Sequence, residues 1–152
     1  MWETGGRGFW NYAVILKWDK EGGAAGKEAC MSVSMPKMDL EGKTLQFDIM
    51  DLQEGFAEGE AKLLDLEIVA EDSQGKEAVV QVGEYCAIYP AFLVRLNKLQ
   101  YIWKELAYKH QFQTVSIPME DFTGVDRAEI CKVTFRFPEE KGKVAIDNIG
   151  VR

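Results

Sequence analysis

Residues 44–49 read Thr-Leu-Gln-Phe-Asp-Ile, a stretch in which polar and apolar side chains strictly alternate. Successive side chains of a β-strand point to opposite faces of its sheet, so this stretch predicts a strand with one face on a core and the other in water. The same alternation recurs in the ranges 64–68, 80–82, 115–119 and 133–137. Between these runs lie Gly-containing clusters typical of turns, at 21–23, 41–43, 72–75 and 140–142.

Strand-like runs of this kind extend along the whole chain, with spacings typical of an all-β sandwich or barrel. The sequence has no internal repeat, low-complexity tract or linker. Its 152 residues suit one domain, so we expect a single all-β domain spanning residues 1–152.

Charge and composition exclude several classes of partner. The chain carries 25 acidic and 18 basic side chains, for a formal net charge of −7. Nucleic acids and anionic membranes attract cationic surfaces, so we expect neither as a partner. No apolar run approaches the ~18–20 residues that span a bilayer. The first residues lack the pattern of a signal peptide, which leaves either a cytoplasmic protein or one module of a larger secreted polypeptide.

Motifs for catalysis are missing. His110 is the single histidine, and the three cysteines, Cys30, Cys86 and Cys131, show no metal-binding spacing. Glycine-rich phosphate-binding motifs and nucleophile motifs are also absent from the sequence. Carboxylates are plentiful, and glycoside hydrolysis needs only two of them. We therefore expect a protein that is not an enzyme, with a small glycan-degrading enzyme as the less favoured alternative.

The aromatic side chains are more informative. Continued alternation through residues 80–89 would place Gln81, Tyr85 and Tyr89 on the face opposite Val80 and Val82. We expect tyrosines that share a face with Gln to be exposed in part. They then either stack on the C–H face of a sugar or serve as edge residues with only their hydroxyls wet.

A hairpin is predicted next to this run. Residues 92–97 and 98–103 are two β-prone stretches meeting at Asn97-Lys98, and a two-residue turn there would place Phe92 opposite Trp103. Arg95 and Gln100 then lie on the other face, where planar guanidinium and amide groups suit sugar hydroxyls. Trp103 falls on the presumed core face, but near the end of the hairpin, where it could lean out.

The last third of the chain resembles a known pattern. Residues 112–122 open with Phe-Gln and end in Ile117-Pro118-x-x-x-Phe122, an apolar strand follows at 133–137, and a final strand carries Ile146-Asp147-Asn148-Ile149. This order resembles the carboxy-terminal part of β-jelly-roll carbohydrate-binding modules of the galactose-binding-like superfamily. The apolar spacing of two becomes three at 146–149, which predicts a β-bulge.

The resemblance implies a β-sandwich jelly roll of two antiparallel sheets. It also implies a non-catalytic module that binds a plant cell-wall polysaccharide, such as a β-glucan or xyloglucan, in a shallow aromatic-lined groove on the concave sheet. The expected ligand-binding residues are Tyr85, Tyr89, Gln81, Arg95, Gln100 and Trp103. A structural or protein-interaction jelly roll that packs on a neighbouring enzyme domain is the alternative.

The same resemblance implies further partners. Relatives often hold a structural calcium ion through the Asp of the last strand, which corresponds to Asp147 here, although the amino-terminal acidic partner is not recognisable in this sequence. Such modules are usually linked to a catalytic domain in a larger secreted or cell-surface protein. That setting would explain why this chain carries no signal peptide.

Overall fold

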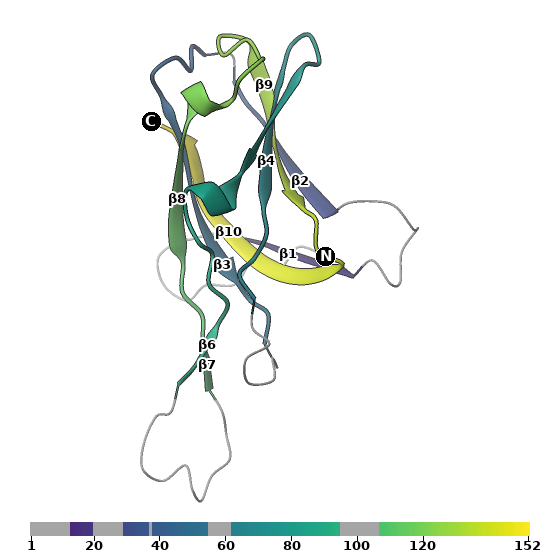
Figure 1. Ribbon diagram of the computed structural model, residues 1–152, viewed down its shortest axis with the longest axis vertical. Helices are drawn as coiled ribbons and strands as arrows, with labels where there is room; N and C mark the ends of the chain where they lie inside the picture. The colour runs from purple at the N-terminus through teal and green to yellow at the C-terminus, as the bar shows by residue number, and fades with distance from the viewer. Residues whose placement is uncertain (1–12, 20–28, 37, 55–61, 95–106) are drawn as a thin grey trace, which may run out of the picture.

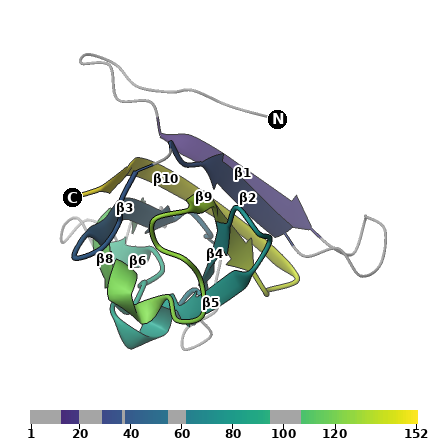
Figure 2. The ribbon, with the colours of Figure 1, turned by 90° about the horizontal axis from the view of Figure 1, so that it is seen from above.

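Two four-stranded antiparallel sheets make up most of the computed structural model, which describes residues 13–19, 29–36, 38–54, 62–94 and 107–152. The first sheet has the order β1-β10-β3-β8, formed by Val14–Asp19, Lys141–Val151, Thr44–Asp51 and Gln113–Pro118. The second sheet has the order β2-β9-β4-β5, formed by Ala29–Ser34, Ile130–Phe137, Glu67–Asp72 and Glu77–Gln81. The two sheets face each other around a common core (Figures 1 and 2). The predicted all-β sandwich is confirmed.

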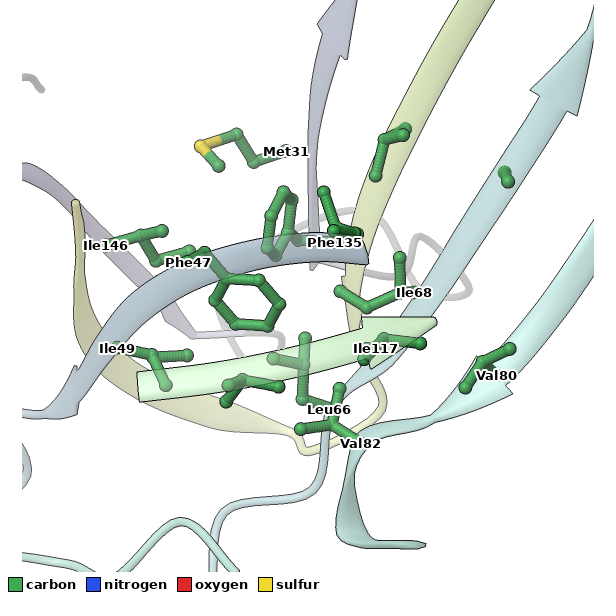
Figure 3. Packing of buried hydrophobic residues seen from close by; sticks show 14 of the residues in the cluster. Met31, Phe47, Ile49, Leu66, Ile68, Val80, Val82, Ile117, Phe135 and Ile146 are labelled. Atoms are coloured by element: carbon green, nitrogen blue, oxygen red, sulfur yellow. The ribbon is translucent and has the colours of Figure 1, made fainter. Parts of the chain in front are cut away.

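The apolar residues that alternate with polar ones in the sequence are the residues that pack in this core. In β3 every second residue is buried, and Phe47 and Ile49 point toward the second sheet. Phe47 meets Phe135 of β9 edge to face, with ring centroids 4.9 Å apart. Figure 3 shows these two rings surrounded by aliphatic side chains from both sheets. Aromatic pairs in this geometry stabilise a core by about 0.5–1.5 kcal/mol beyond the area that they bury.

The carboxy-terminal pattern has the structure that it predicts. Pro118 is the last residue of β8, and the 3-10 turn η4 (Met119–Asp121) leads to Phe122, whose side chain is fully buried. In β10 the register shifts between Asp147 and Gly150, and Asn148 between them has a φ of +53°. This is the predicted bulge, because three steps along β10 match two steps along β3.

Gly142 has a different role from the predicted turn. It lies inside β10, opposite Trp18 of β1, and a Cβ atom at this position would overlap the Trp18 ring. That ring packs on Phe137 at a centroid distance of 4.6 Å, and its indole N–H donates to the carbonyl of Glu139 at 3.0 Å. Glycine is therefore needed here so that the indole can lie flat across the strand.

The hairpin prediction is wrong in its register. Strands β6 (Phe92–Val94) and β7 (Ala107–Lys109) form a separate two-stranded antiparallel sheet. In this sheet Phe92 pairs with Lys109, not with Trp103. Residues 95–106 connect these strands and lie outside the described residues. A turn at Asn97-Lys98 would have required a positive φ at Lys98, which lysine disfavours. In Figure 1 the β6–β7 hairpin projects below the two large sheets.

The described part of the chain contains no helix long and apolar enough to cross a bilayer.

Substitution of Gly142 tests the packing of Trp18. We expect Gly142→Ala to lower the free energy of unfolding by about 1–3 kcal/mol, because the added methyl group must displace the indole ring. Urea denaturation followed by tryptophan fluorescence measures this loss. Gly150→Ala in the same strand is the matched control, since a Cβ there meets nothing within 4 Å. Equal losses in both variants would contradict the role assigned to Gly142.

Candidate functional site

The outer face of the second sheet carries an ordered set of polar side chains. Residues opposite one another in an antiparallel ladder point to the same face, so the register arranges this face in three rows across the four strands. The rows run in the order β2, β9, β4 and β5 and consist of Cys30, Arg136, Glu67 and Gln81; then Ser32, Thr134, Val69 and Val79; then Ser34, Lys132, Glu71 and Glu77.

The first row is a hydrogen-bonded network of planar groups. The Gln81 amide donates to Oε1 of Glu67 at 2.7 Å, and Nη1 of Arg136 lies 3.4 Å from Oε2 of the same carboxylate. Glu67 thus holds an amide and a guanidinium group in place on either side of it. Because Gln81 is exposed and Arg136 is half-buried, both retain polar surface toward solvent.

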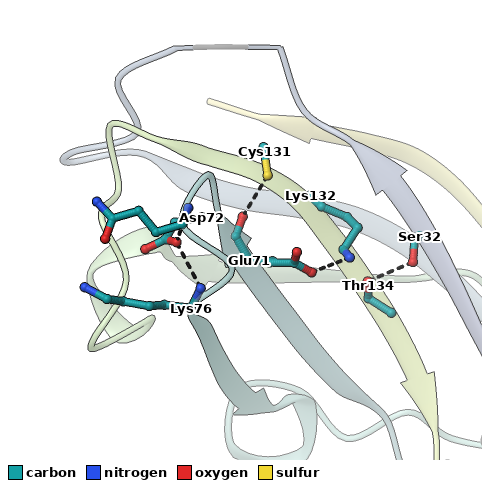
Figure 4. A network of polar contacts seen from close by, with 8 residues as sticks. Ser32, Glu71, Asp72, Lys76, Cys131, Lys132 and Thr134 are labelled. Carbon is teal, nitrogen blue, oxygen red and sulfur yellow. Dashed lines mark hydrogen bonds and ion pairs between the residues drawn. The ribbon is translucent and has the colours of Figure 1, made fainter.

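The third row contains a second ion pair. Lys132 of β9 binds the carboxylate of Glu71 on β4, and this contact raises the pKa of Lys132 (Figure 4). Between the two charged rows, the hydroxyls of Ser32 and Thr134 are 2.8 Å apart, and Val69 is only 3% exposed although it lies on the outer face. The middle row of this face, Ser32, Thr134, Val69 and Val79, therefore carries hydroxyl and apolar groups, and it lies between two rows that contain charged side chains.

One end of this sheet is anchored by Asp72, which is 1% exposed. Burial by itself would raise its pKa, but the backbone N–H groups of Lys76, Asp126 and Gln74 all donate to the carboxylate, and the net pKa is lowered. Figure 4 shows this carboxylate closing the β4–β5 turn beside the third row.

Of the predicted ligand-binding residues, Gln81 lies on this face. The prediction that Tyr85 and Tyr89 share it is wrong, because β5 ends at Gln81 and the 3-10 turn η2 (Val82–Glu84) follows. The backbone N–H groups of Tyr85 and Cys86 both donate to the carbonyl of Val82. This turn rotates the chain away from the sheet, so the period of two ends there. Gly83, a residue that weakens strands, was the signal in the sequence.

Tyr85 joins the two sheets. Its ring packs against the core and its hydroxyl donates to Oδ2 of Asp121 in η4 at 2.6 Å. The hydrogen bond to Asp121 is the main cause that raises the pKa of Tyr85 to about 12, with burial and the nearby charges of Asp121 and Glu84 adding to it. Tyr85 thus connects the segment after β5 to the segment after β8, at the edges of the two sheets.

Tyr89 is 64% exposed and lies away from the three rows. Its backbone N–H donates to the side-chain oxygen of Gln113 at 2.9 Å, and the amide of Gln113 donates back to the carbonyl of Tyr89 at 3.2 Å. Arg95, Gln100 and Trp103 lie outside the described residues. Among the outward residues of β2, β9, β4 and β5, none is aromatic.

Asp147 lies on the first sheet, opposite Asp48. The Thr114 hydroxyl and the Asn148 amide donate to Asp48 at 2.6 and 2.7 Å and hold its pKa below the ordinary value. Asp147 itself accepts the backbone N–H of Asn148 at 2.8 Å. No group of three or more His, Cys, Asp or Glu side chains suited to a metal occurs in the part of the chain that the structure describes. A calcium ion at Asp147 stays a prediction.

Most of the side chains on this face were not predicted as site residues. The sequence shows that Thr134, Arg136 and Glu67 alternate with apolar residues and therefore point away from the core. It does not show that β9 lies between β2 and β4, which is what brings these residues into rows with Gln81.

Comparison with solved structures gives the same fold. The chain is similar to a family 30 carbohydrate-binding module of the cellulosomal cellulase Cel9D-Cel44B of Clostridium thermocellum, with 13% identity and a TM-score of 0.59 over 92% of this chain and 73% of that one. It is also similar to the family 11 module of the cellulosomal cellulase Lic26A-Cel5E of the same organism, with 15% identity and a TM-score of 0.53 over 90% of this chain and 72% of that one.

A further structure of a family 11 module from Clostridium thermocellum is in complex with a β-1,3-1,4-mixed-linked tetrasaccharide, and it matches with 15% identity and a TM-score of 0.53 over 90% of this chain and 73% of that one. No protein-family model matches the sequence. No curated protein matches it either. The likeness to jelly-roll carbohydrate-binding modules that the carboxy-terminal pattern indicated is thus confirmed for the fold.

Tyr85→Phe tests the contact between the two sheets. We expect it to lower the free energy of unfolding by about 1 kcal/mol, the usual contribution of one hydrogen bond. Because the folded-state pKa lies above the unfolded value of 10, this contribution is complete below pH 10 and is lost as the pH rises to about 12. Tyrosinate absorbance should show one late-titrating group that is missing from the variant. A wild-type protein whose tyrosines all titrate near pH 10 would contradict the assigned bond.

Proposed function

We propose that the chain is a non-catalytic carbohydrate-binding module that binds a neutral plant polysaccharide on the outer face of the second sheet. The observation that carries the proposal is the first row, in which Glu67 holds the Gln81 amide and the Arg136 guanidinium group side by side. Sugar hydroxyls are recognised by planar donors and acceptors of this kind, fixed in advance by their own hydrogen bonds.

The middle row suits a polysaccharide chain that lies across the strands. Ser32 and Thr134 offer hydroxyls, while Val79, which is 48% exposed, offers apolar contact to the C–H groups of a sugar ring. Four strands at about 4.8 Å spacing give a face about 15 Å wide, which is a length suited to a short oligosaccharide. The face holds both signs of charge, so a neutral ligand meets donors and acceptors without a net repulsion.

The ligand class takes support from proteins with the same fold. The similar module in complex with a β-1,3-1,4-mixed-linked tetrasaccharide makes mixed-linkage β-glucan the first ligand to test, followed by xyloglucan. The similar modules of cellulosomal cellulases support the further proposal that this chain acts outside the cell, linked to a catalytic domain, where it raises the local concentration of that domain at its substrate. Tyr89, Arg95, Gln100 and Trp103 remain candidate ligand-binding residues beyond the three rows.

The experiment is affinity electrophoresis in gels that contain soluble mixed-linkage β-glucan or xyloglucan. We expect wild-type protein to be retarded by at least one of them. Gln81→Ala should weaken binding about two- to tenfold, the effect of losing one hydrogen bond to the ligand. Gln74→Ala is the matched control, since it removes another exposed glutamine whose contact to Asp72 is made by the backbone alone.

Three results would contradict the proposal. Unretarded migration in every neutral polysaccharide would remove the binding function. Equal retardation of wild-type protein and Gln81→Ala would place the ligand elsewhere. Release of reducing sugars from the same polysaccharides would favour the enzyme alternative.

A further inference from the structure

Two pairs of like charges lie directly across strands on the outer face of the first sheet. Lys17 of β1 is opposite Lys143 of β10, and Asp147 of β10 is opposite Asp48 of β3. Side chains opposite one another in an antiparallel ladder have Cβ atoms about 4.5–5.5 Å apart, so like charges at these positions destabilise the pairing of the strands. The face therefore carries a local excess of positive charge at one place and of negative charge at another.

An apolar row lies midway between the two pairs. Ile15 of β1 is opposite Ala145 of β10, which in turn is opposite Met50 of β3. Lys143 precedes Ala145 by two residues along β10 and Asp147 follows it by two, so all three side chains point to the outer face. We call the three sets of side chains on the first sheet the basic row (Lys17, Lys143), the apolar row (Ile15, Ala145, Met50) and the acidic row (Asp147, Asp48).

The basic row is not neutralised within the described part of the chain. Neither Lys17 nor Lys143 forms an ion pair with another described residue. In the next row Asp19 is opposite Lys141, so these two charges balance each other and leave the basic row uncompensated. The second sheet differs, because both outward cations of β9 contact glutamates of β4.

The acidic row keeps its charge. The Thr114 hydroxyl and the Asn148 amide donate to the carboxylate of Asp48 and lower its pKa, so this group stays ionised beside Asp147 at neutral pH. Asp147 accepts the backbone N–H of Asn148. These neutral donors stabilise the negative charge without cancelling it, so the acidic row still attracts a cation from outside the chain.

We propose that the outer face of the first sheet is an interface between two copies of this chain. A two-fold axis that runs along the apolar row turns the second copy over and reverses the order of its rows. The basic row of each copy then faces the acidic row of the other, with Lys143 against Asp147 of the second copy. Because the axis repeats every contact, this pairing occurs twice, as in any isologous dimer.

A second copy fits this face better than a partner that carries one sign of charge. An acidic partner would be attracted by the basic row and repelled by the acidic row, and a basic partner would meet the reverse. The second copy supplies both charges in the required order. In the apolar row Ala145 is 2% exposed, and its small side chain between the half-buried Ile15 and Met50 lets two sheets approach each other.

The size of the face limits the strength of the dimer. Its four strands have 6, 11, 8 and 6 residues, which at about 4.8 Å between strands and about 3.3 Å per residue gives on the order of 500 Å². A stable interface buries about 800 Å² of each partner. We therefore expect a weak dimer with a dissociation constant between about 10 μM and 1 mM. The second sheet of each copy stays on the outside of this dimer.

The test is sedimentation equilibrium of the full chain from about 10 μM to 1 mM. Wild-type protein should show a monomer–dimer equilibrium. Lys143→Glu and Asp147→Lys each set like charges against one another at both copies of the contact, so each should weaken dimerisation at least about tenfold. Mixing the two variants should restore a dimer, because the exchanged charges face each other at one contact and the native charges at the other.

The controls separate the interface from folding and from net charge. Lys143→Glu should fold normally, because it turns the like-charge pair with Lys17 into a pair of opposite charges. The melting temperature checks the folding of both variants. Lys109→Glu changes the net charge by the same amount at an exposed position of β7, outside this face, and should leave the association unchanged.

Wild-type protein that stays monomeric up to about 1 mM would overturn the inference. A dimer that both variants retain would also overturn it, because its interface would lie elsewhere. Variants that remain monomeric when mixed, or equal weakening by Lys109→Glu, would contradict the pairing of the basic and acidic rows. None of these results touches the proposed polysaccharide site, which lies on the other sheet.

Discussion

The contact between Phe47 and Phe135 lies where the two sheets must meet, and the rest of the structure depends on it. When every second residue of a strand points into this core, the residues between them point to the outer face of the sheet. A shift of β9 by one residue would exchange Phe135 for Arg136 in the core, at the cost of a buried charge without a partner. The register that buries the rings is therefore also the register that lines up Gln81, Glu67 and Arg136 on the outside.

The features that interrupt regular strands explain where the fold departs from simple alternation. The bulge at Asn148 lets β10 continue past β3 while the Asn148 amide reaches Asp48. At the other edge, η2 and η4 end the strands β5 and β8 and bring Tyr85 to Asp121. These contacts involve segments with few ladder hydrogen bonds, so side chains supply the connections that the backbone lacks there.

The sequence predicts the fold well because its main signals are local. Alternation at 44–49, the proline that ends β8 and the spacing change at 146–149 each act within a few residues, and each is found as predicted. The proposed face was predicted only in part. Gln81 was expected on an outer strand face, as it is, whereas Arg136 and Glu67 were not predicted beside it because they come from strands far apart in the sequence. Tyr85 and Tyr89 were placed wrongly because one glycine-containing turn ended the strand earlier than alternation alone indicates. Two expectations stay predictions: a calcium ion at Asp147, and a ligand-binding role for Gln81, Tyr85, Tyr89, Arg95, Gln100 and Trp103.

The central claim is that the outer face of the second sheet holds the sugar chain. The most direct test is to titrate isotopically labelled protein with the mixed-linkage tetrasaccharide and follow backbone and side-chain amide resonances. The account predicts that shifts concentrate on the outward residues of β9, β4 and β5, including the side-chain amide of Gln81, while β1 and the outer residues of β3 stay unchanged. Shifts confined to the first sheet, or none at saturating sugar, would contradict it.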